Sequence, residues 1–482
     1  MPGLTPSESG GAPGRSESGA AALAQLWSHA GLPQAALQRA SCTGTDPVLA
    51  SSFAVGTAAQ ACIAAAALAA TEVGLLRNAV QQQVCVDMLH AALECCSYFR
   101  VDGRAPDIWD KLSGLYPCGD DGGAGWVRIH TNFAHHRDAA LRLLRLPQGD
   151  ATQREAVQHA LRAWRAADFE AAAADAGAVV AALRSFDEWD EHAQGQAVAR
   201  QPLLRIERIG DAPPRTLPPL ARHSKPLHGL RVLDLTRILA GPVGTRALAA
   251  YGADVLLVNA PHLPNIEAIA DTSRGKLSAH ADLRSEAGRA AFDKVLRDAH
   301  VFVQGYRPGA LARLGYAPQQ LAVLRPGIVA VSLSAYGNAG PWSERRGFDS
   351  LVQTATGFNL AEAQAFGSGP PRALPMQVLD HATGYLMALG AQATLLRQMR
   401  EGGSWHVQVS LAATGQWLRG LGRVDGGFVA SKPDFKPYLE TSSSGFGELT
   451  ALRHAAQLSV TPAGWDRPSV RPGTHALEWP GA

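Results

Sequence analysis

Beyond about residue 228, short apolar runs alternate with amphipathic helical stretches. The runs are rich in Val, Leu and Ile, are bounded by turn residues, and lie at 230–235, 253–259, 300–304 and 328–334. A strand without polar alternation is buried on both faces, which is typical of a parallel sheet covered by helices on each side. The pattern therefore predicts a doubly wound, mostly parallel α/β sheet over 228–424. Ligands of such sheets bind beyond the carboxyl ends of the strands, which nominates the loops that begin at Thr236, Asn259, Gln304 and Ser334.

The part before this sheet has a different pattern. Residues 19–208 are mostly helical, with one short strand in GWVRIHTN (125–132), and predict a smaller helical or α+β domain. The Gly- and Ser-rich residues 1–18 are predicted to be a disordered leader, and the Pro-rich residues 209–227 a linker. Residues 425–482 are expected to form a tail that packs on both domains.

One segment of the first part has a counterpart in the second. Residues 55–92 resemble 381–413: each has a helix of small residues, a basic turn, a Val-x-Val strand and an amphipathic continuation. Val84 and Val86 match Val407 and Val409. A single match of this kind indicates a partial duplication and not a solenoid.

Composition and charge exclude several classes of function. The chain has 482 residues, 44 Lys and Arg, 42 Asp and Glu, and a net charge of +2 without long runs of one sign, so neither nucleic acid nor a membrane is expected as a partner. Residues 54–71 are Ala-rich but too weakly apolar for a membrane span. The six cysteines form no C-x-x-C pair, which favours reduced thiols and a cytoplasmic location.

Common cofactor and catalytic motifs are also missing. No G-x-G-x-x-G follows the first strand and no G-x-x-x-x-G-K-[ST] occurs, which disfavours NAD and ATP, and the signatures of serine hydrolases and zinc proteases are absent too. His135 and His136 are adjacent, point in different directions and do not share a metal ion easily, so no metal is expected and both are interpreted as surface or partly buried residues.

Six sequence blocks together resemble the family III CoA-transferases, which include formyl-CoA transferase, carnitine CoA-transferase and the alpha-methylacyl-CoA racemases. They occur in the order of the family, at 227–242 (LHGLRVLDLTRILAGP), 251–258 (YGADVLLV), 273–283 (SRGKLSAHADL), 306–316 (YRPGALARLGY), 334–341 (SAYGNAGP) and 379–384 (LDHATG). The N-terminal part is similar to the later half of this family, so the two halves stand in rearranged order.

The resemblance implies an enzyme, a Rossmann-like CoA-binding catalytic domain and coenzyme A as co-substrate. It also implies acyl-CoA and carboxylic acid substrates and a homodimer. Asp380 matches the nucleophilic aspartate of the family and would form a mixed anhydride and then a thioester. The basic residues that match positions along the CoA cleft, and the loop residues beside them, are the predicted cofactor-binding set: Thr236, Arg237, Arg274, Lys276, Tyr306 and Arg307.

Alternatives stay open at this stage. Asp380 is also interpretable as a helix cap, and the basic residues as solvated surface charges. The racemases of the family place His immediately before the aspartate that matches Asp349, but Phe348 occupies that position here and cannot transfer a proton, which favours transferase chemistry. An acyl-CoA racemase or epimerase, or a non-catalytic CoA-binding subunit, are the competing hypotheses.

Overall fold

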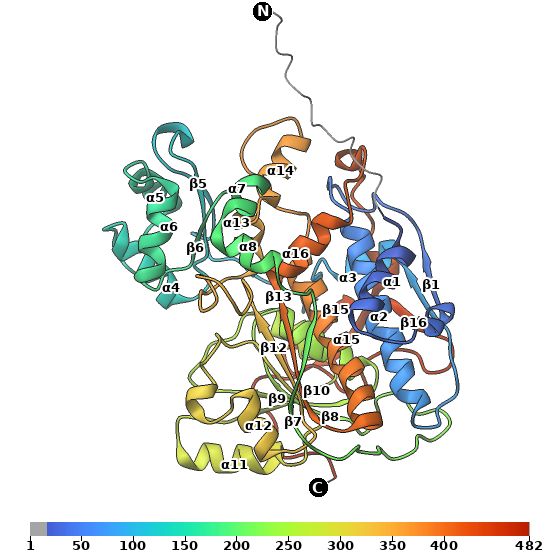
Figure 1. The fold of residues 1–482 in the computed structure, drawn as a ribbon. Coiled ribbons are helices and arrows are strands. Elements are labelled where there is room, and N and C mark those ends of the chain that lie inside the picture. Colours follow the sequence, from blue (N-terminus) through green and yellow to red (C-terminus); the bar gives the residue numbers. More distant parts are fainter. Residues whose placement is uncertain (1–16, 482) are drawn as a thin grey trace, which may run out of the picture.

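A twisted seven-stranded sheet forms the centre of the molecule (Figure 1). The computed structural model describes residues 17–481. The strand order is β10-β9-β8-β11-β12-β13-β7, and all neighbours are parallel except the edge pair β13 and β7. The bounds are β7 Arg205–Gly210, β8 Arg231–Leu235, β9 Asp254–Asn259, β10 Lys276–His280, β11 Val301–Gln304, β12 Val329–Ser334 and β13 Ser404–Ser410. The four predicted strands and the predicted fold class are confirmed.

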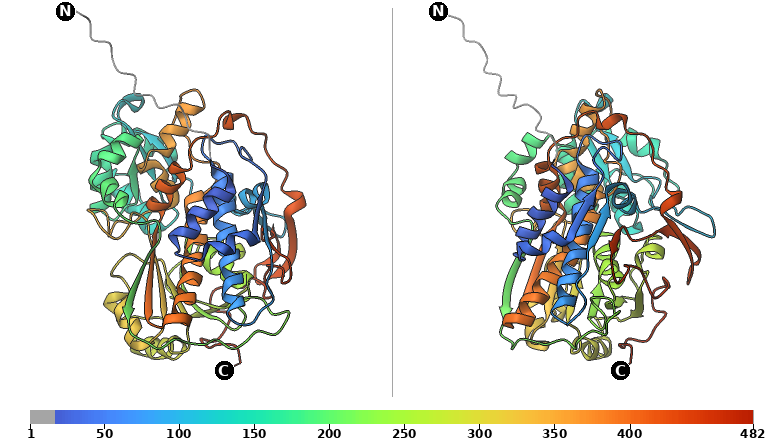
Figure 2. Two further views of the ribbon diagram at one scale, coloured as in Figure 1. Left: turned by 45° about the vertical axis from the view of Figure 1, so that its right-hand side comes forward. Right: turned by 90° about the vertical axis from the view of Figure 1, so that its right-hand side faces the viewer.

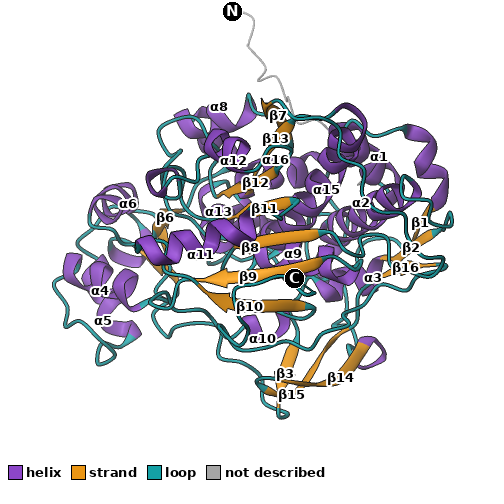
Figure 3. Ribbon diagram, turned by 90° about the horizontal axis from the view of Figure 1, so that it is seen from below, coloured by secondary structure: helices purple, strands orange, loops and turns teal. Residues whose placement is uncertain are grey.

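Helices cover both faces of this sheet, which explains why its strands are apolar throughout (Figure 3). Val232 packs into the core on one face and the next residue, Leu233, into the core on the other. The first face is covered by α9 (Ala240–Ala250) and α15 (Val378–Glu401), and the second by α11 (Glu286–Leu296) and α12 (Pro318–Leu324). The short helix α10 (Ile269–Thr272) precedes β10, and α16 (Leu411–Gly420) follows β13.

Helix α15 packs unusually close to α9, and this contact fixes where α15 begins. A Cβ built on Gly384 would lie 2.4 Å from the Ala240 carbonyl oxygen, so only glycine permits the approach. The first turn of α15 is thereby held beside the carboxyl ends of the central strands.

The N-terminal helices share the core of the large sheet. They are α1 (Gly19–His29), α2 (Val55–Leu75) and α3 (Met88–Glu94), and α2 runs beside α15 in both views of Figure 2. By length and composition α2 is the one helix among residues 17–481 that passes as a membrane span, but 89% of its apolar window is buried inside the fold. A small sheet lies next to it, with strands β1 (Ala40–Thr43), β2 (Val84–Asp87) and β16 (Ala456–Leu458).

A separate hydrophobic core is formed by the part of the chain that lies between α3 and the large sheet in the sequence. Its sheet has the order β4-β5-β6 (Gly114–Pro117, Trp126–Ile129, Val180–Ala182) and packs against α4 (Ala134–Leu143), α5 (Arg154–Leu161) and α6 (Ala166–Asp175). We call residues 110–183 the small domain. Four further helices connect it to the large sheet: α7 (Phe186–Glu191), α8 (Ala193–Ala199), α13 (Asp349–Ala355) and α14 (Phe358–Ala365).

The C-terminal tail is an integral part of the fold. Strands β14 (Leu439–Ser444) and β15 (Gly447–Leu452) form a sheet with β3 (Phe99–Val101) from the N-terminal part. The predicted linker starts at residue 209, but Ile209 and Gly210 still belong to β7. Residues 211–227 contain no helix or strand. Of the predicted leader, residues 1–16 lie outside the described residues, and Ser18 caps α1 by accepting a hydrogen bond from the Ala21 amide. The remaining domain boundaries stay predictions.

Candidate active site

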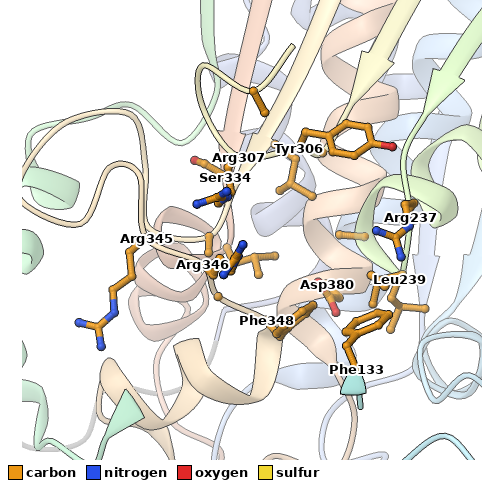
Figure 4. Close-up of a pocket in the computed structure, with 18 of the residues that line it drawn as sticks. Phe133, Arg237, Leu239, Tyr306, Arg307, Ser334, Arg345, Arg346, Phe348 and Asp380 are labelled. Atoms are coloured by element: carbon orange, nitrogen blue, oxygen red, sulfur yellow. The ribbon is translucent and has the colours of Figure 1, made fainter. Parts of the chain in front are cut away.

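A cavity of about 390 Å³ opens at the carboxyl ends of the central strands, where the doubly wound pattern places a ligand site (Figure 4). Three parts of the chain form its wall: the loops after β8, β11 and β12, the start of α15, and the small domain. Its volume is in the range of small-molecule sites. Ser334 and His136 each contribute a buried polar atom, Oγ and Nδ1, that has no hydrogen-bond partner among the described residues. The cavity therefore contains polar groups that are available to a ligand.

Asp380 lies in this wall, in the first turn of α15. Its side chain is only 7% exposed, and its backbone N–H donates a hydrogen bond of 2.9 Å to Oδ2 of Asp349. The positive end of the helix dipole and the free N–H groups of the first turn favour negative charge at such a position. The predicted nucleophile thus faces a cleft and does not point into the core or the solvent.

A second carboxyl group lies next to Asp380. Asp349, at the start of α13, is fully buried and accepts hydrogen bonds from the Asp380 backbone and from the Gln353 amide. Burial raises the pKa of Asp349 to about 6. Burial and the charge of Asp349 raise the pKa of Asp380 well above its ordinary value. Because the two groups are close, ionisation of one opposes ionisation of the other.

Three guanidinium groups approach the same cavity. Arg237, Arg307 and Arg346 line it, and among residues 17–481 none of the three forms an ion pair with a carboxylate. Arg237 donates to the Pro264 carbonyl, Arg346 donates to the Gly177 carbonyl at 3.4 Å, and Arg307 is exposed. An anion in the cavity would therefore find positive charge that the protein itself leaves uncompensated.

The small domain closes one side of the cavity with aromatic residues. Phe133, His135 and His136 line it, and the ring of His130 stacks on Phe348 at 3.9 Å between centroids. Burial lowers the pKa of His136 to about 3, so its ring is neutral. The sequence interpretation of both histidines as surface or partly buried residues fits His135, which is exposed, but not His136, which is 4% exposed, because nothing in the local pattern indicates that the small domain folds back onto the large sheet. Within residues 17–481 no group of three or more His, Cys, Asp and Glu side chains is arranged to hold a metal ion.

The predicted cofactor-binding residues separate into two groups. Arg237, Tyr306 and Arg307 lie in the cavity wall with Asp380. Thr236 does not line it: the residue is 1% exposed, and its backbone N–H and its hydroxyl both donate to the Asp234 carboxylate below the loop.

Arg274 and Lys276 do not line the cavity either, because each is committed to a buried ion pair. The Lys276 ammonium is fully buried and donates to Asp234 at 3.1 Å and to Thr245 at 2.7 Å. Arg274 binds Asp271 and lies over the Trp465 ring, 3.8 Å from its centroid. A buried charge without a partner is very costly, so neither side chain is available to a coenzyme. We therefore remove both from the candidate site.

Comparisons with known proteins match part of this chain to one family model. The family model described as CoA-transferase family III matches residues 227–422. An acyl-CoA transferase of Gibberella moniliformis is 29% identical over 372 residues, which cover 69% of this chain and 64% of that protein. An acetyl-coenzyme A transferase of Hypoxylon pulicicidum is 33% identical over 42% of this chain and 35% of that protein.

Among solved structures, that of a hypothetical protein from Mycobacterium tuberculosis is 32% identical. The match covers 42% of this chain and 58% of that chain, with a TM-score of 0.38. The present chain spans between about one quarter and two thirds of the length of the curated relatives named in the comparison.

Proposed function

We propose that this chain transfers CoA from an acyl-CoA to a carboxylic acid, with Asp380 as the covalent carrier, and the match of residues 227–422 to the model of CoA-transferase family III supports this proposal. The observation that carries the proposal is the position of the Asp380 carboxyl group. It lies in the wall of a cavity, at a helix N-terminus, and the same cavity is lined by guanidinium groups that form no ion pair with a carboxylate among residues 17–481. A helix-capping aspartate would not require an open cavity in front of it.

The chemistry needs no metal and no ATP. The ionised Asp380 carboxylate attacks the carbonyl carbon of the donor thioester, the C–S bond breaks, and the coenzyme leaves as its thiolate. The thiolate attacks the aspartyl carbonyl of the resulting anhydride, which releases the donor acid and leaves a thioester on Asp380. The acceptor carboxylate attacks this thioester, the C–S bond breaks, and a second anhydride forms as the coenzyme leaves again as its thiolate. Attack of the thiolate on the acceptor acyl carbon then yields the new acyl-CoA and restores Asp380.

Other residues have supporting roles in this proposal. Asp349 holds the first turn of α15 through the Asp380 backbone N–H, and the loops after β8 and β11 bring Arg237, Tyr306 and Arg307 to the cavity. We propose that these three bind the anionic part of the coenzyme. All six cysteines are unpaired thiols, which supports a cytoplasmic location.

Trapping of the acyl group tests the proposal. The protein is incubated with an acyl-CoA, the ester-like intermediate is trapped with hydroxylamine or borohydride, and the modified peptide is located by mass spectrometry. We expect modification confined to the peptide that contains Asp380, and loss of both modification and exchange in Asp380→Ala with CoA binding retained.

A matched control is available for this experiment. Asp168 is exposed and is also the third residue of its helix, α6, so Asp168→Ala removes an aspartate from the same helical position without touching the cavity. This variant should exchange CoA like the wild type. Normal turnover by Asp380→Ala would refute the assignment, and no modification with any of several acyl-CoAs would favour a non-catalytic CoA-binding subunit.

A further inference from the structure

Two segments of this chain align without a gap at a constant spacing. Helices α2 and α15 begin at residues 55 and 378, and α3 and α16 begin at residues 88 and 411; both differences are 323 residues. The tetrapeptide Arg-Val-Asp-Gly occurs at 100–103 and again at 423–426, with the same spacing. We call residues 55–103 copy one and residues 378–426 copy two. The weak sequence match extends over two helices and the strand between them, and it keeps its register throughout.

The hydrogen bonds at the starts of these helices also correspond. In copy two the Asp380 N–H donates to Oδ2 of Asp349 at 2.9 Å, and in copy one the Thr57 N–H donates to Oδ2 of Asp46 at 2.8 Å. Asp87 and Ser410, which are equivalent, are the N-caps of α3 and α16, and each accepts from the backbone N–H three residues later. The architecture of the unit is thus retained in both copies.

The chemistry is retained in only one of them. The counterpart of Asp380 is Thr57, which is 1% exposed and whose hydroxyl donates to Asp46 at 2.8 Å. The Thr57 hydroxyl is thus buried and hydrogen-bonded, and Thr57 has no carboxylate that could carry an acyl group. Copy one is therefore a natural control for copy two, because it preserves the helix start and lacks the nucleophile.

Copy one instead supports the site of copy two. Ser97 Oγ lies 2.7 Å from Nε2 of His381, next to Asp380, and Gln392 of α15 donates to the Ala66 carbonyl of α2 at 3.1 Å. The small domain, which follows copy one in the chain, returns to the cavity with Phe133 and its neighbours. The lining of the cavity thus combines the start of copy two, the loops of the large sheet and the small domain.

We infer that the chain is an internally paired enzyme: copy one is a degenerate active-site unit that, with the small domain, completes the single site of copy two within the same chain. The part of this inference that concerns acyl transfer rests on the proposed function. It predicts one acyl-accepting position per chain, at residue 380 and not at residue 57, and a site that needs no second chain, in contrast to the homodimer that the family resemblance implies.

Cross-linking across the contact between the two parts tests the pairing without any assay of activity. Arg419 of α16, in copy two, forms an ion pair at 2.8 Å with Asp190 of α7, the helix that directly follows the small domain in the chain, and both side chains are accessible. The variant Asp190→Cys/Arg419→Cys is treated with a short bis-maleimide at low protein concentration, and each single variant serves as the control for the native thiols. We expect a cross-linked species of monomer mass that contains both peptides. A predominant species of twice that mass would overturn the inference, because the parts would then be exchanged between chains.

Acyl labelling supplies the second test. With saturating acyl-CoA and reductive trapping, we expect no more than one label per chain, on the Asp380 peptide. A label on the peptide that contains Thr57, or close to two labels per chain, would overturn the single-site inference. If neither peptide is labelled, the proposed function fails, while the cross-linking result still decides whether the chain pairs with itself.

Discussion

Replacement of Asp349 by asparagine isolates the effect of one buried charge on the proposed nucleophile. Asparagine has nearly the same shape, and its amide oxygen still accepts the Asp380 backbone N–H. The change removes the negative charge that raises the pKa of Asp380. The NH2 group of the new asparagine faces the Gln353 side-chain N–H, and two donors cannot form a hydrogen bond. One hydrogen bond is therefore lost, which costs about 1 kcal/mol of folding stability.

The size of the pKa change follows from Coulomb's law. With an effective dielectric constant of about 20, two unit charges about 4 Å apart repel by about 4 kcal/mol, and by about 2 kcal/mol at about 8 Å. Removal of this repulsion should lower the pKa of Asp380. The nucleophile is the ionised form, so the wild type loses activity as the pH falls through the titration of the pair. Since about 1.4 kcal/mol corresponds to a factor of ten, Asp349→Asn should keep its activity to a pH at least about one unit lower.

The assay is the pH dependence of kcat/KM for CoA exchange, measured from pH 4 to 8 with the folded fraction monitored in parallel. Glu362→Gln is the control, because Glu362 is a buried carboxylate that binds Ser51 and Ser52 and does not line the cavity. Its acidic limb should match that of the wild type. An acidic limb of Asp349→Asn that stays in place, or moves to higher pH, would refute the electrostatic coupling of the two carboxyl groups.

Three further variants test the division between site and scaffold. Arg307→Ala should raise the Kd for CoA at least tenfold, because a charge-assisted bond contributes about 1.5–3 kcal/mol, whereas Arg313→Ala in the same exposed loop should bind CoA like the wild type. Lys276→Met leaves Asp234 buried without its cation and should lower the free energy of unfolding by about 3–5 kcal/mol, with unchanged CoA affinity of the folded protein by calorimetry. Burial alone would raise the pKa of Glu94, but His454 and Arg246 lower it to about 2. The ionised Glu94 therefore stabilises the fold above about pH 4.3, and this contribution is lost as the pH falls towards 2. Denaturant unfolding of Glu94→Gln at several pH values should lack this pH dependence of the free energy of unfolding.

The parts of the fold that could be predicted are those in which burial leaves a local pattern. Strands β8, β9, β11 and β12 could be recognised because both of their faces are covered, and the helix that carries Asp380 because its sequence block resembles the family. The direction of a charged side chain after a strand leaves no such pattern. Lys276 and Arg307 look equivalent in the sequence, yet one is paired with Asp234, 42 residues away, and the other faces the cavity.

The contribution of the small domain could not be predicted for a related reason. Phe133 and His136 reach the cavity only because the domain lies beside the carboxyl ends of strands in a sheet whose first central strand begins about a hundred residues later. No periodicity in residues 110–183 encodes that placement. The partial duplication was visible in the sequence as a similarity, but its constant register became clear only when the starts of the helices were known.

The long separation between α2 and α15 affects how the chain is made. Helix α2 leaves the ribosome 323 residues before the helix that covers it, an interval of roughly 15 to 65 seconds at synthesis rates of about 5–20 residues per second. During this time the 21-residue apolar helix α2 is without the helix that later covers it. We therefore expect nascent chains to engage holding chaperones until translation has passed residue 401, and truncated transcripts that stop earlier to yield aggregates or membrane-associated fragments.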